Sequence, residues 1–200
     1  VSFEIFENTT IGLVGESGSG KSTLGKAIAN LISYEGDIFF KDKNLNLNSN
    51  QEKKVLKKNI QIVFQDPYGS LSPRMTIGEI VGEGLGVHFK LSKIEQENKI
   101  DKVLSDVGIE SAAKNKYPHE FSGGQRQRIG IARALYFDKE IMIFDESTSS
   151  LDLETESKII KNIKNSDFGK TIIIVSHRIE NLKYCEKIYE IKDSSISLIN

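Results

Sequence analysis

The segment that most constrains this chain runs from Gly15 to Ser22 and reads Gly-Glu-Ser-Gly-Ser-Gly-Lys-Ser. Two glycines separated by four residues, followed by lysine and serine, have the spacing of a phosphate-binding loop. The apolar run 11–14 predicts a buried strand before the loop. The stretch 22–31, with apolar residues at 24, 27, 28 and 31, predicts a helix after it. This order of strand, loop and helix is the setting in which such a loop holds phosphates.

Each part of this phosphate loop has its own expected role. Glycines 15, 18 and 20 permit backbone conformations closed to larger residues and turn successive N–H groups toward one anion. Lys21 supplies a point charge for the β and γ phosphates, and Ser22 supplies a hydroxyl ligand for Mg²⁺. The residues expected to contact a nucleotide are Gly15, Glu16, Ser17, Gly18, Ser19, Gly20, Lys21, Ser22 and Thr23. The alternative is a glycine-rich turn that binds nothing.

Composition narrows the classes of protein further. The 200 residues carry a net charge of −1, which gives no overall attraction to nucleic acid. Residues 51–58 contain four lysines, interpreted as a solvated helix face with an anion-binding patch as the alternative. The single Cys185 excludes an intramolecular disulfide and suits a reducing compartment. The longest apolar runs have four residues, whereas a membrane-spanning helix needs about 20, so any membrane link is expected through a partner.

Strand-like and helix-like segments alternate along the chain. Strands are expected at 37–40, 60–64, 141–144, 171–175 and 187–191, and helices at 125–136 and 153–165. This order predicts an α/β fold with a mainly parallel sheet and crossover helices. Residues 1–200 are expected to form one domain with a helical insertion at about 66–136. Alternation of Val1, Phe3 and Ile5 with polar residues predicts a half-buried strand, and hence that N-terminal strands of the fold are missing from the sequence.

A second candidate site lies where the apolar run 141–144 stops at Asp145 and Glu146. The carboxyl ends of parallel strands are where open α/β sheets bind ligands, and alternation sends adjacent side chains in different directions. Asp145 fits a Mg²⁺ partner, and Glu146 fits the base that orients and deprotonates a water. A solvated turn is the alternative.

A third candidate site is the segment Ser122-Gly123-Gly124-Gln125. Ser122 and Gln125 have the spacing of a capping box, which predicts a helix beginning near Gly123. The free N–H groups at a helix start can bind an anion. An ordinary helix cap without a ligand is the alternative.

These segments resemble the nucleotide-binding subunits of ABC transporters, and the resemblance extends over essentially all 200 residues. It implies an α/β P-loop NTPase (RecA-like) core with a helical signature subdomain. The matching motifs are the phosphate loop 15–22, the glutamine loop at Gln65, the signature 122–125, the carboxylate strand 141–146, the D-loop 150–152 and the switch histidine His177.

The resemblance implies how these residues act together. Two subunits, identical or related, pack head to tail, with ATP between the phosphate loop of one and the signature of the other. Ser122 and Gly124 then contact the γ-phosphate in trans, with Gly123, Gln125 and Asp152 nearby. Glu146 polarises the attacking water, His177 bonds the γ-phosphate, and Gln65 reaches Mg²⁺ or the water. A capped histidine is the alternative for His177, and His88 and His119 are expected to be structural or surface residues.

Two stretches are similar to the oligopeptide, dipeptide and nickel importer branch of this family. They are residues 63–75 and 117–121, and Tyr68 to Met75 is expected to line a groove for a helix of a transmembrane subunit. In contrast, the stretches 147–152, 177–178 and 184–188 resemble exporters. The family's adenine-stacking aromatic is matched only by Phe3 or Phe6, for which a core role is the preferred expectation.

The sequence therefore predicts an ATPase at the cytoplasmic face of the membrane that powers uptake. Its expected partners are a second ATPase subunit, transmembrane permeases and, indirectly, a solute-binding protein, without nucleic acid. An exporter ATPase, a soluble ABC-type ATPase acting on nucleic acid or ribosomes, and a nucleotide-binding module without hydrolysis are the alternatives.

Overall fold

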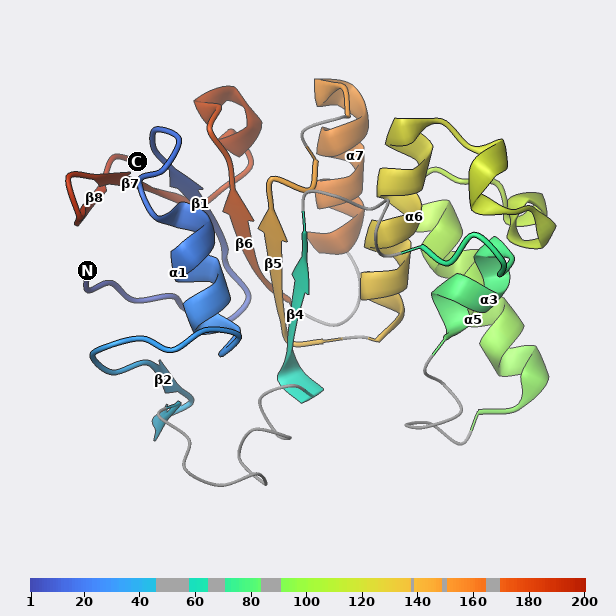
Figure 1. Cartoon of the computed structure of the whole chain (residues 1–200), viewed down its shortest axis with the longest axis horizontal. Coiled ribbons are helices and arrows are strands. Elements are labelled where there is room, and N and C mark those ends of the chain that lie inside the picture. Colours follow the sequence, from blue (N-terminus) through green and yellow to red (C-terminus); the bar gives the residue numbers. More distant parts are fainter. Residues whose placement is uncertain (46–57, 65–70, 84–90, 138, 149–150, 165–169) are drawn as a thin grey trace. The chain divides into compact units, whose positions relative to one another are not determined.

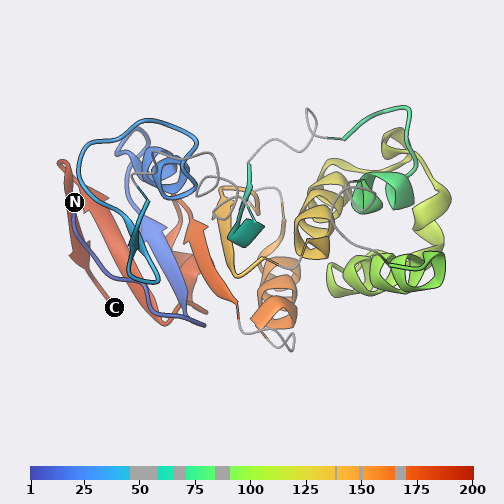
Figure 2. The ribbon, with the colours of Figure 1, turned by 90° about the horizontal axis from the view of Figure 1, so that it is seen from below.

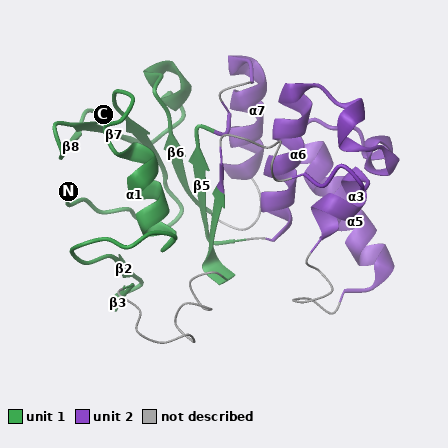
Figure 3. Cartoon of the chain, in the orientation of Figure 1, with its two compact units in different colours: residues 1–62, 139–146, 169–200 green, residues 63–138, 147–168 purple. Residues whose placement is uncertain are grey.

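A computed structural model describes residues 1–45, 58–64, 71–83, 91–137, 139–148, 151–164 and 170–200 (Figure 1). The chain divides into two compact units (Figure 3). The core unit comprises residues 1–62, 139–146 and 169–200, and the helical unit comprises residues 63–138 and 147–168. Each unit is described by itself below.

A six-stranded sheet forms the centre of the core unit, in the order β4-β5-β6-β1-β7-β8. β5 pairs with β6, β6 with β1, and β1 with β7, all in parallel, whereas β8 pairs with β7 in antiparallel. The mainly parallel sheet predicted from the sequence is thus confirmed. The strands are β1 (Thr10–Val14), β4 (Ile60–Val63), β5 (Ile141–Asp145), β6 (Thr171–Val175), β7 (Lys187–Lys192) and β8 (Ser195–Leu198).

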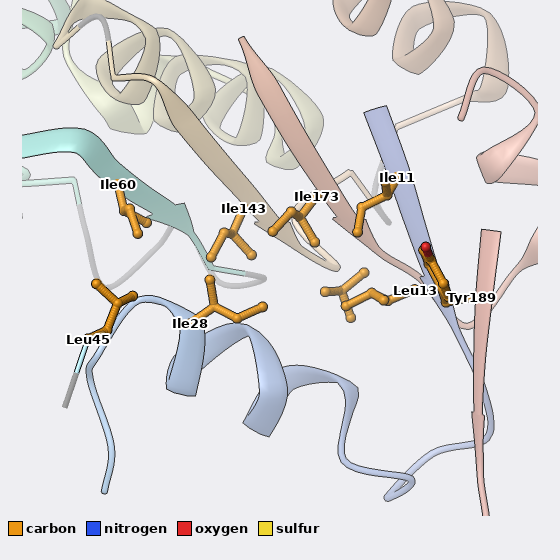
Figure 4. Packing of buried hydrophobic residues seen from close by; sticks show 9 residues of the cluster. Ile11, Leu13, Ile28, Leu45, Ile60, Ile143, Ile173 and Tyr189 are labelled. Carbon is orange, nitrogen blue, oxygen red and sulfur yellow. The ribbon is translucent and has the colours of Figure 1, made fainter. Parts of the chain in front are cut away.

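The central strands are buried on both faces because their apolar runs have no polar alternation. All residues of β6 are buried, as are 142–145 of β5. Helix α1 (Lys21–Ile28) covers one face of the sheet (Figure 2). Figure 4 shows Ile28 of this helix beneath Ile143 and Ile173, which are 0% exposed. This packing holds α1 against the sheet, and Ser22 in the first turn of the helix contacts Asp145 at the carboxyl end of β5.

Three expectations for the core unit are corrected. The helix after the loop ends at Ile28 rather than Leu31, because Asn30 turns into a left-handed conformation (φ 53°) and leaves Leu31 50% exposed. The strand expected at 37–40 is only β2 (Phe39–Phe40), since a tight turn leads directly into β3 (Lys43–Asn44). Residues 1–6 form no strand, although Phe3 and Ile5 are half-buried against the core.

The helical unit is built around α6 (Gly123–Tyr136), whose Ile129, Ile131 and Ala132 are 0% exposed. The other elements are α3 (Ile77–Gly82), α5 (Lys93–Asp106), α7 (Leu153–Lys164) and the 3-10 turns η2 (Ser111–Asn115) and η3 (Pro118–Glu120). Helices α3, α5 and α6 each begin with a capping box. Among the described helices, none has the length and apolarity needed to cross a bilayer.

Candidate nucleotide-binding site

The phosphate loop has the glycine-dependent backbone that its sequence predicts. Gly18 and Gly20 have φ angles of 81° and 97°, in the left-handed region that a residue with a Cβ enters at a cost. The N–H of Ser19 donates to the carbonyl of Glu16 at 3.2 Å, which closes the turn between β1 and α1. Helix α1 begins directly after Gly20 without a side-chain cap, so its first N–H groups remain available to an anion.

Gly15 is required for a different reason, the close approach of two backbone segments. A Cβ at this position would lie 2.4 Å from the carbonyl oxygen of Ile191 and 2.8 Å from Ser19 Oγ. Ile191 is in β7, the strand that runs beside β1. The loop is therefore seated against the neighbouring strand as well as on α1.

Lys21 is buried within the loop, with only 4% of its surface exposed. Its Nζ donates to the carbonyls of Gly15 at 2.8 Å and Glu16 at 2.7 Å. Ser19 Oγ is buried without a hydrogen-bond partner among the described residues. An ammonium group and an unpartnered hydroxyl beside a free helix start fit a phosphate, which supplies only acceptor oxygens at neutral pH.

Ser22 joins the phosphate loop to the carboxylate strand. Its Oγ donates to Asp145 Oδ1 at 2.6 Å, although the two residues are 123 positions apart. Asp145 is 6% exposed and ends β5. A hydroxyl and a carboxylate held in contact at the edge of a phosphate site are the hard oxygen ligands that Mg²⁺ prefers, so these two residues fit the ion.

Glu146 follows β5 in a left-handed conformation, with φ of 50°. Its N–H donates to the carbonyl of Val175 at 3.1 Å, so the β5–β6 ladder extends one step past the strand. Holding a residue with a Cβ in the left-handed region costs roughly 1–2 kcal/mol of conformational free energy. Residues held in such unfavourable conformations are found mostly at functional sites. The Glu146 side chain is 22% exposed, whereas Asp145 is 6% exposed. Separate roles for the two carboxylates stay a prediction.

His177 lies beside Glu146 at the end of β6. Its Nδ1 is 3.8 Å from Glu146 Oε2, and the side chains are 46% and 22% exposed respectively. Sequence analysis did not single out Ser176, whose buried Oγ accepts the Arg178 N–H at 3.0 Å and donates to the Arg178 carbonyl at 3.1 Å. These bonds hold the turn that carries His177. The only sequence signal for Ser176 is its position directly after the buried run of β6.

The signature segment 122–125 lies in the helical unit and has the predicted cap. Ser122 Oγ accepts the Gln125 N–H at 3.3 Å, and Gln125 Oε1 accepts the Ser122 N–H at 2.9 Å. Gly123 and Gly124 open α6 and are half-buried. The capping prediction is therefore confirmed, whereas contact of this segment with a nucleotide stays a prediction.

Asp152 caps α7 in the same unit. Its Oδ1 accepts the Thr155 N–H at 2.9 Å, and this bond holds the pKa of the Asp152 carboxyl below its usual value. The residue is exposed, so its carboxylate is reachable from solvent. Its contact with a nucleotide also stays a prediction.

The structure thus brings five candidate residues together in the core unit: Lys21, Ser22, Asp145, Glu146 and His177. Gln65 and His88 lie outside the described residues, as do 68–70 of the expected groove and the lysine-rich stretch up to 57. His119 is exposed and stacks on Tyr117 at 5.9 Å between ring centroids.

The two N-terminal aromatics differ from each other. Phe3 is half-buried and its ring centroid lies 5.2 Å from that of Tyr189, in agreement with a core role. Phe6 is 53% exposed, and Lys187 Nζ lies 4.6 Å from its ring centroid. The expected core role is therefore wrong for Phe6.

Comparison with protein families identifies the family of the chain. Residues 1–149 match the family model described as ABC transporter. The chain belongs to the ABC transporter family.

Two similar proteins are named as oligopeptide transport ATP-binding proteins. The chain is 44% identical over 191 residues to the oligopeptide transport ATP-binding protein OppF of Bacillus subtilis (strain 168), an alignment that covers 92% of this chain and 62% of OppF. It is 41% identical over 188 residues to the oligopeptide transport ATP-binding protein AppF of the same organism, covering 92% of this chain and 57% of AppF. The chain thus spans less than two thirds of the length of these relatives.

Solved structures of ATP-binding cassettes have the same fold. CbiO1 of Clostridium perfringens, part of the ABC transporter complex cbiONQ, is 31% identical with a TM-score of 0.86, and the match covers 99% of this chain and 79% of cbiO1. A dimeric post-hydrolysis state of the cassette MJ0796, bound to ADP and Pi, is 30% identical with a TM-score of 0.86, covering 99% and 88%. The predicted α/β P-loop fold is confirmed.

Proposed function

We propose that this chain is the ATP-binding and ATP-hydrolysing subunit of an ABC transporter that powers uptake of oligopeptides or dipeptides, or of nickel, through separate transmembrane subunits. The names of OppF and AppF support peptide transport. The domain proposed for residues 1–200 is a single ATPase domain, with the helical insertion at about 66–136 carrying the signature segment.

The observation that carries this proposal is the hydrogen bond between Ser22 Oγ and Asp145 Oδ1 at 2.6 Å. It joins the phosphate loop to the carboxylate strand, which supports one shared site for the residues proposed to bind and to hydrolyse ATP. Ser22 and Asp145, with Gln65, would hold Mg²⁺, which neutralises phosphate charge when bound. Lys21 and the loop residues 15–20 hold the β and γ phosphates, with Thr23 beside them.

Hydrolysis uses the two side chains at the ends of β5 and β6. Glu146 accepts a proton from the attacking water and orients it, and Gln65 contacts the same water or the ion. His177 donates a hydrogen bond to the γ-phosphate. The 3.8 Å separation between His177 Nδ1 and Glu146 Oε2 supports the proposal that both groups act on one ATP molecule.

The working species in this proposal is a dimer that holds two ATP molecules. Ser122, Gly123, Gly124 and Gln125 of one subunit meet the γ-phosphate held by the other, with Asp152 nearby. The dimeric structures of the cassette MJ0796 support a dimer. The dimer is peripheral, at the cytoplasmic face of the membrane, where Tyr68 to Met75 of each subunit would receive a helix of a permease. A solute-binding protein acts through the permeases.

Glu146→Gln tests the catalytic role. Loss of a general base should lower steady-state phosphate release by about 10²- to 10⁴-fold while ATP still binds. Glu140→Gln is the matched control, because Glu140 precedes the same strand but pairs with Lys41 at 2.6 Å and lies 49% exposed. An unchanged turnover in Glu146→Gln would remove this residue from the mechanism, and an inactive parent chain would favour a module that only binds nucleotide.

Export is the second candidate function, because residues 147–152 resemble exporters and Ser147 stands where the importer branch has proline. The two directions separate in vesicles that contain the co-purified permeases. Import predicts ATP-dependent accumulation of labelled peptide or nickel chelate on the side of the vesicle that bears the ATPase. Movement away from that side would establish export.

A further inference from the structure

The signature segment is preceded by a turn that has its own side-chain cap. In η3, Glu120 Oε2 accepts the backbone N–H of Tyr117 at 2.6 Å. The capping box between Ser122 and Gln125 follows at once. Two caps therefore lie in series along the chain, with only Phe121 between them.

Contacts on both sides anchor this turn within the helical unit. Pro118 and Phe121 are buried, whereas Tyr117, Glu120 and Ser122 are exposed. The Pro118 carbonyl accepts the Phe121 N–H at 3.2 Å and Arg126 Nη1 at 3.4 Å. The turn is thus tied to the interior by two apolar side chains and to α6 by an arginine.

This arrangement fixes an exposed segment before any ligand binds. Ser122 has an extended backbone (φ −65°, ψ 165°) that directs the following N–H groups along α6. A segment already held in its binding conformation loses less conformational entropy when a ligand arrives. Among residues 117–120, the Glu120 carboxylate closes the turn by accepting the N–H of its first residue, Tyr117.

We propose that Glu120 is a positioning residue for the signature segment. By holding the turn 117–120 it fixes Ser122 and the first N–H groups of α6 for the γ-phosphate held by a second copy of the chain. This inference rests on the dimer of the proposed function. Glu120 itself contacts the Tyr117 N–H and not the nucleotide, so its effect is confined to the step at which two subunits close on ATP.

The test measures ATP-driven dimer formation in the Glu146→Gln chain, which keeps ATP intact, by size-exclusion chromatography with light scattering. Adding Glu120→Ala should raise the ATP concentration for half-maximal dimer at least about fivefold, the factor that a typical cap contributes. Affinity of the single subunit for a fluorescent ATP analogue should not change. Glu120→Gln should restore dimer formation, because its amide oxygen accepts the same N–H.

Glu95→Ala is the matched control. Glu95 Oε2 accepts the Ser92 N–H at 2.8 Å in the capping box of α5, so this change removes an equivalent exposed cap elsewhere in the helical unit. Equal losses of ATP-driven dimer formation in Glu95→Ala and Glu120→Ala, or no loss in Glu120→Ala, would overturn this inference and leave the proposed function standing. If the Glu146→Gln parent forms no dimer with ATP, that result contradicts the dimer of the proposed function and therefore this inference as well.

Discussion

Gly15 is the residue of the phosphate loop with the least room for a side chain. Gly15→Ala would place a Cβ 2.4 Å from the Ile191 carbonyl, and forcing these segments apart should lower the free energy of unfolding by roughly 1–3 kcal/mol and weaken ATP binding. Urea unfolding and binding of a fluorescent ATP analogue measure the two effects.

Gly18→Ala is the matched control for Gly15. Nothing lies within 4 Å of a Cβ at Gly18, so only its left-handed backbone (φ 81°) opposes the change, at a cost of about 1 kcal/mol. If both variants lose the same stability, the contact between Gly15 and β7 has no energetic importance.

Asp152 should make stability depend on pH, because its folded pKa is lowered by the Thr155 N–H. A lowered folded pKa stabilises the protein above the unfolded pKa of about 3.9, and this contribution is lost as pH falls through the folded pKa. Asp152→Ala should therefore lower Tm near neutral pH, with a difference from the parent that shrinks below about pH 4. Thermal melts across this pH range give the answer, and a constant difference would contradict it.

At the residue scale, the sequence predicted contacts between side chains better than it predicted backbone conformations. The residue types at Lys21, Ser22 and Asp145 indicated one site, and Ser22 and Asp145 are in contact at 2.6 Å. The left-handed conformation of Glu146 has no such signal, and its N–H bonds the Val175 carbonyl in a strand distant in sequence, a contact that no local pattern predicts.

At the scale of elements, α5 depends on an arginine from α6 at its C-terminus. Arg128 Nη1 donates to the carbonyls of Gly108 at 2.6 Å and Val107 at 3.3 Å, where the helix leaves acceptors unpaired and the dipole favours a cation. Arg128→Ala should lower the free energy of unfolding by about 1–2 kcal/mol, measured by urea denaturation.

The control for Arg128 lies at the opposite end of the same helix. Lys93 is exposed at the first position of α5, where a positive charge gains nothing from the dipole. Lys93→Ala should change stability by less than about 0.5 kcal/mol. A loss in Lys93→Ala as large as that in Arg128→Ala would assign the effect to net charge rather than to the cap.

The predicted strands of the parallel sheet match the structure to within one residue at each end. The signal is strongest in β5 and β6, whose apolar runs between polar residues mark strands buried on both faces. β8 was not predicted. It is a short strand with alternating serines, and pairing with β7, such as Ile191 with Ile196, defines it more than its own composition does. Residues 1–6 show the converse, since their alternation is strand-like but no strand forms.

At the scale of the whole molecule, the core unit holds Lys21, Ser22, Asp145, Glu146 and His177, which we propose bind phosphate and activate water, and the helical unit holds the signature segment. A single chain therefore carries two complementary half-sites in the proposed mechanism. Assembly with a second chain would then be what couples ATP binding to movement of a permease.

A crystal structure of the chain with a non-hydrolysable ATP analogue and Mg²⁺ tests the central claim most directly. The account predicts two chains around two nucleotides, each γ-phosphate lying against Lys21 and Ser22 of one subunit and Ser122 of the other. A nucleotide bound away from Lys21, or two chains that meet through surfaces other than the phosphate loop and the signature segment, would contradict it.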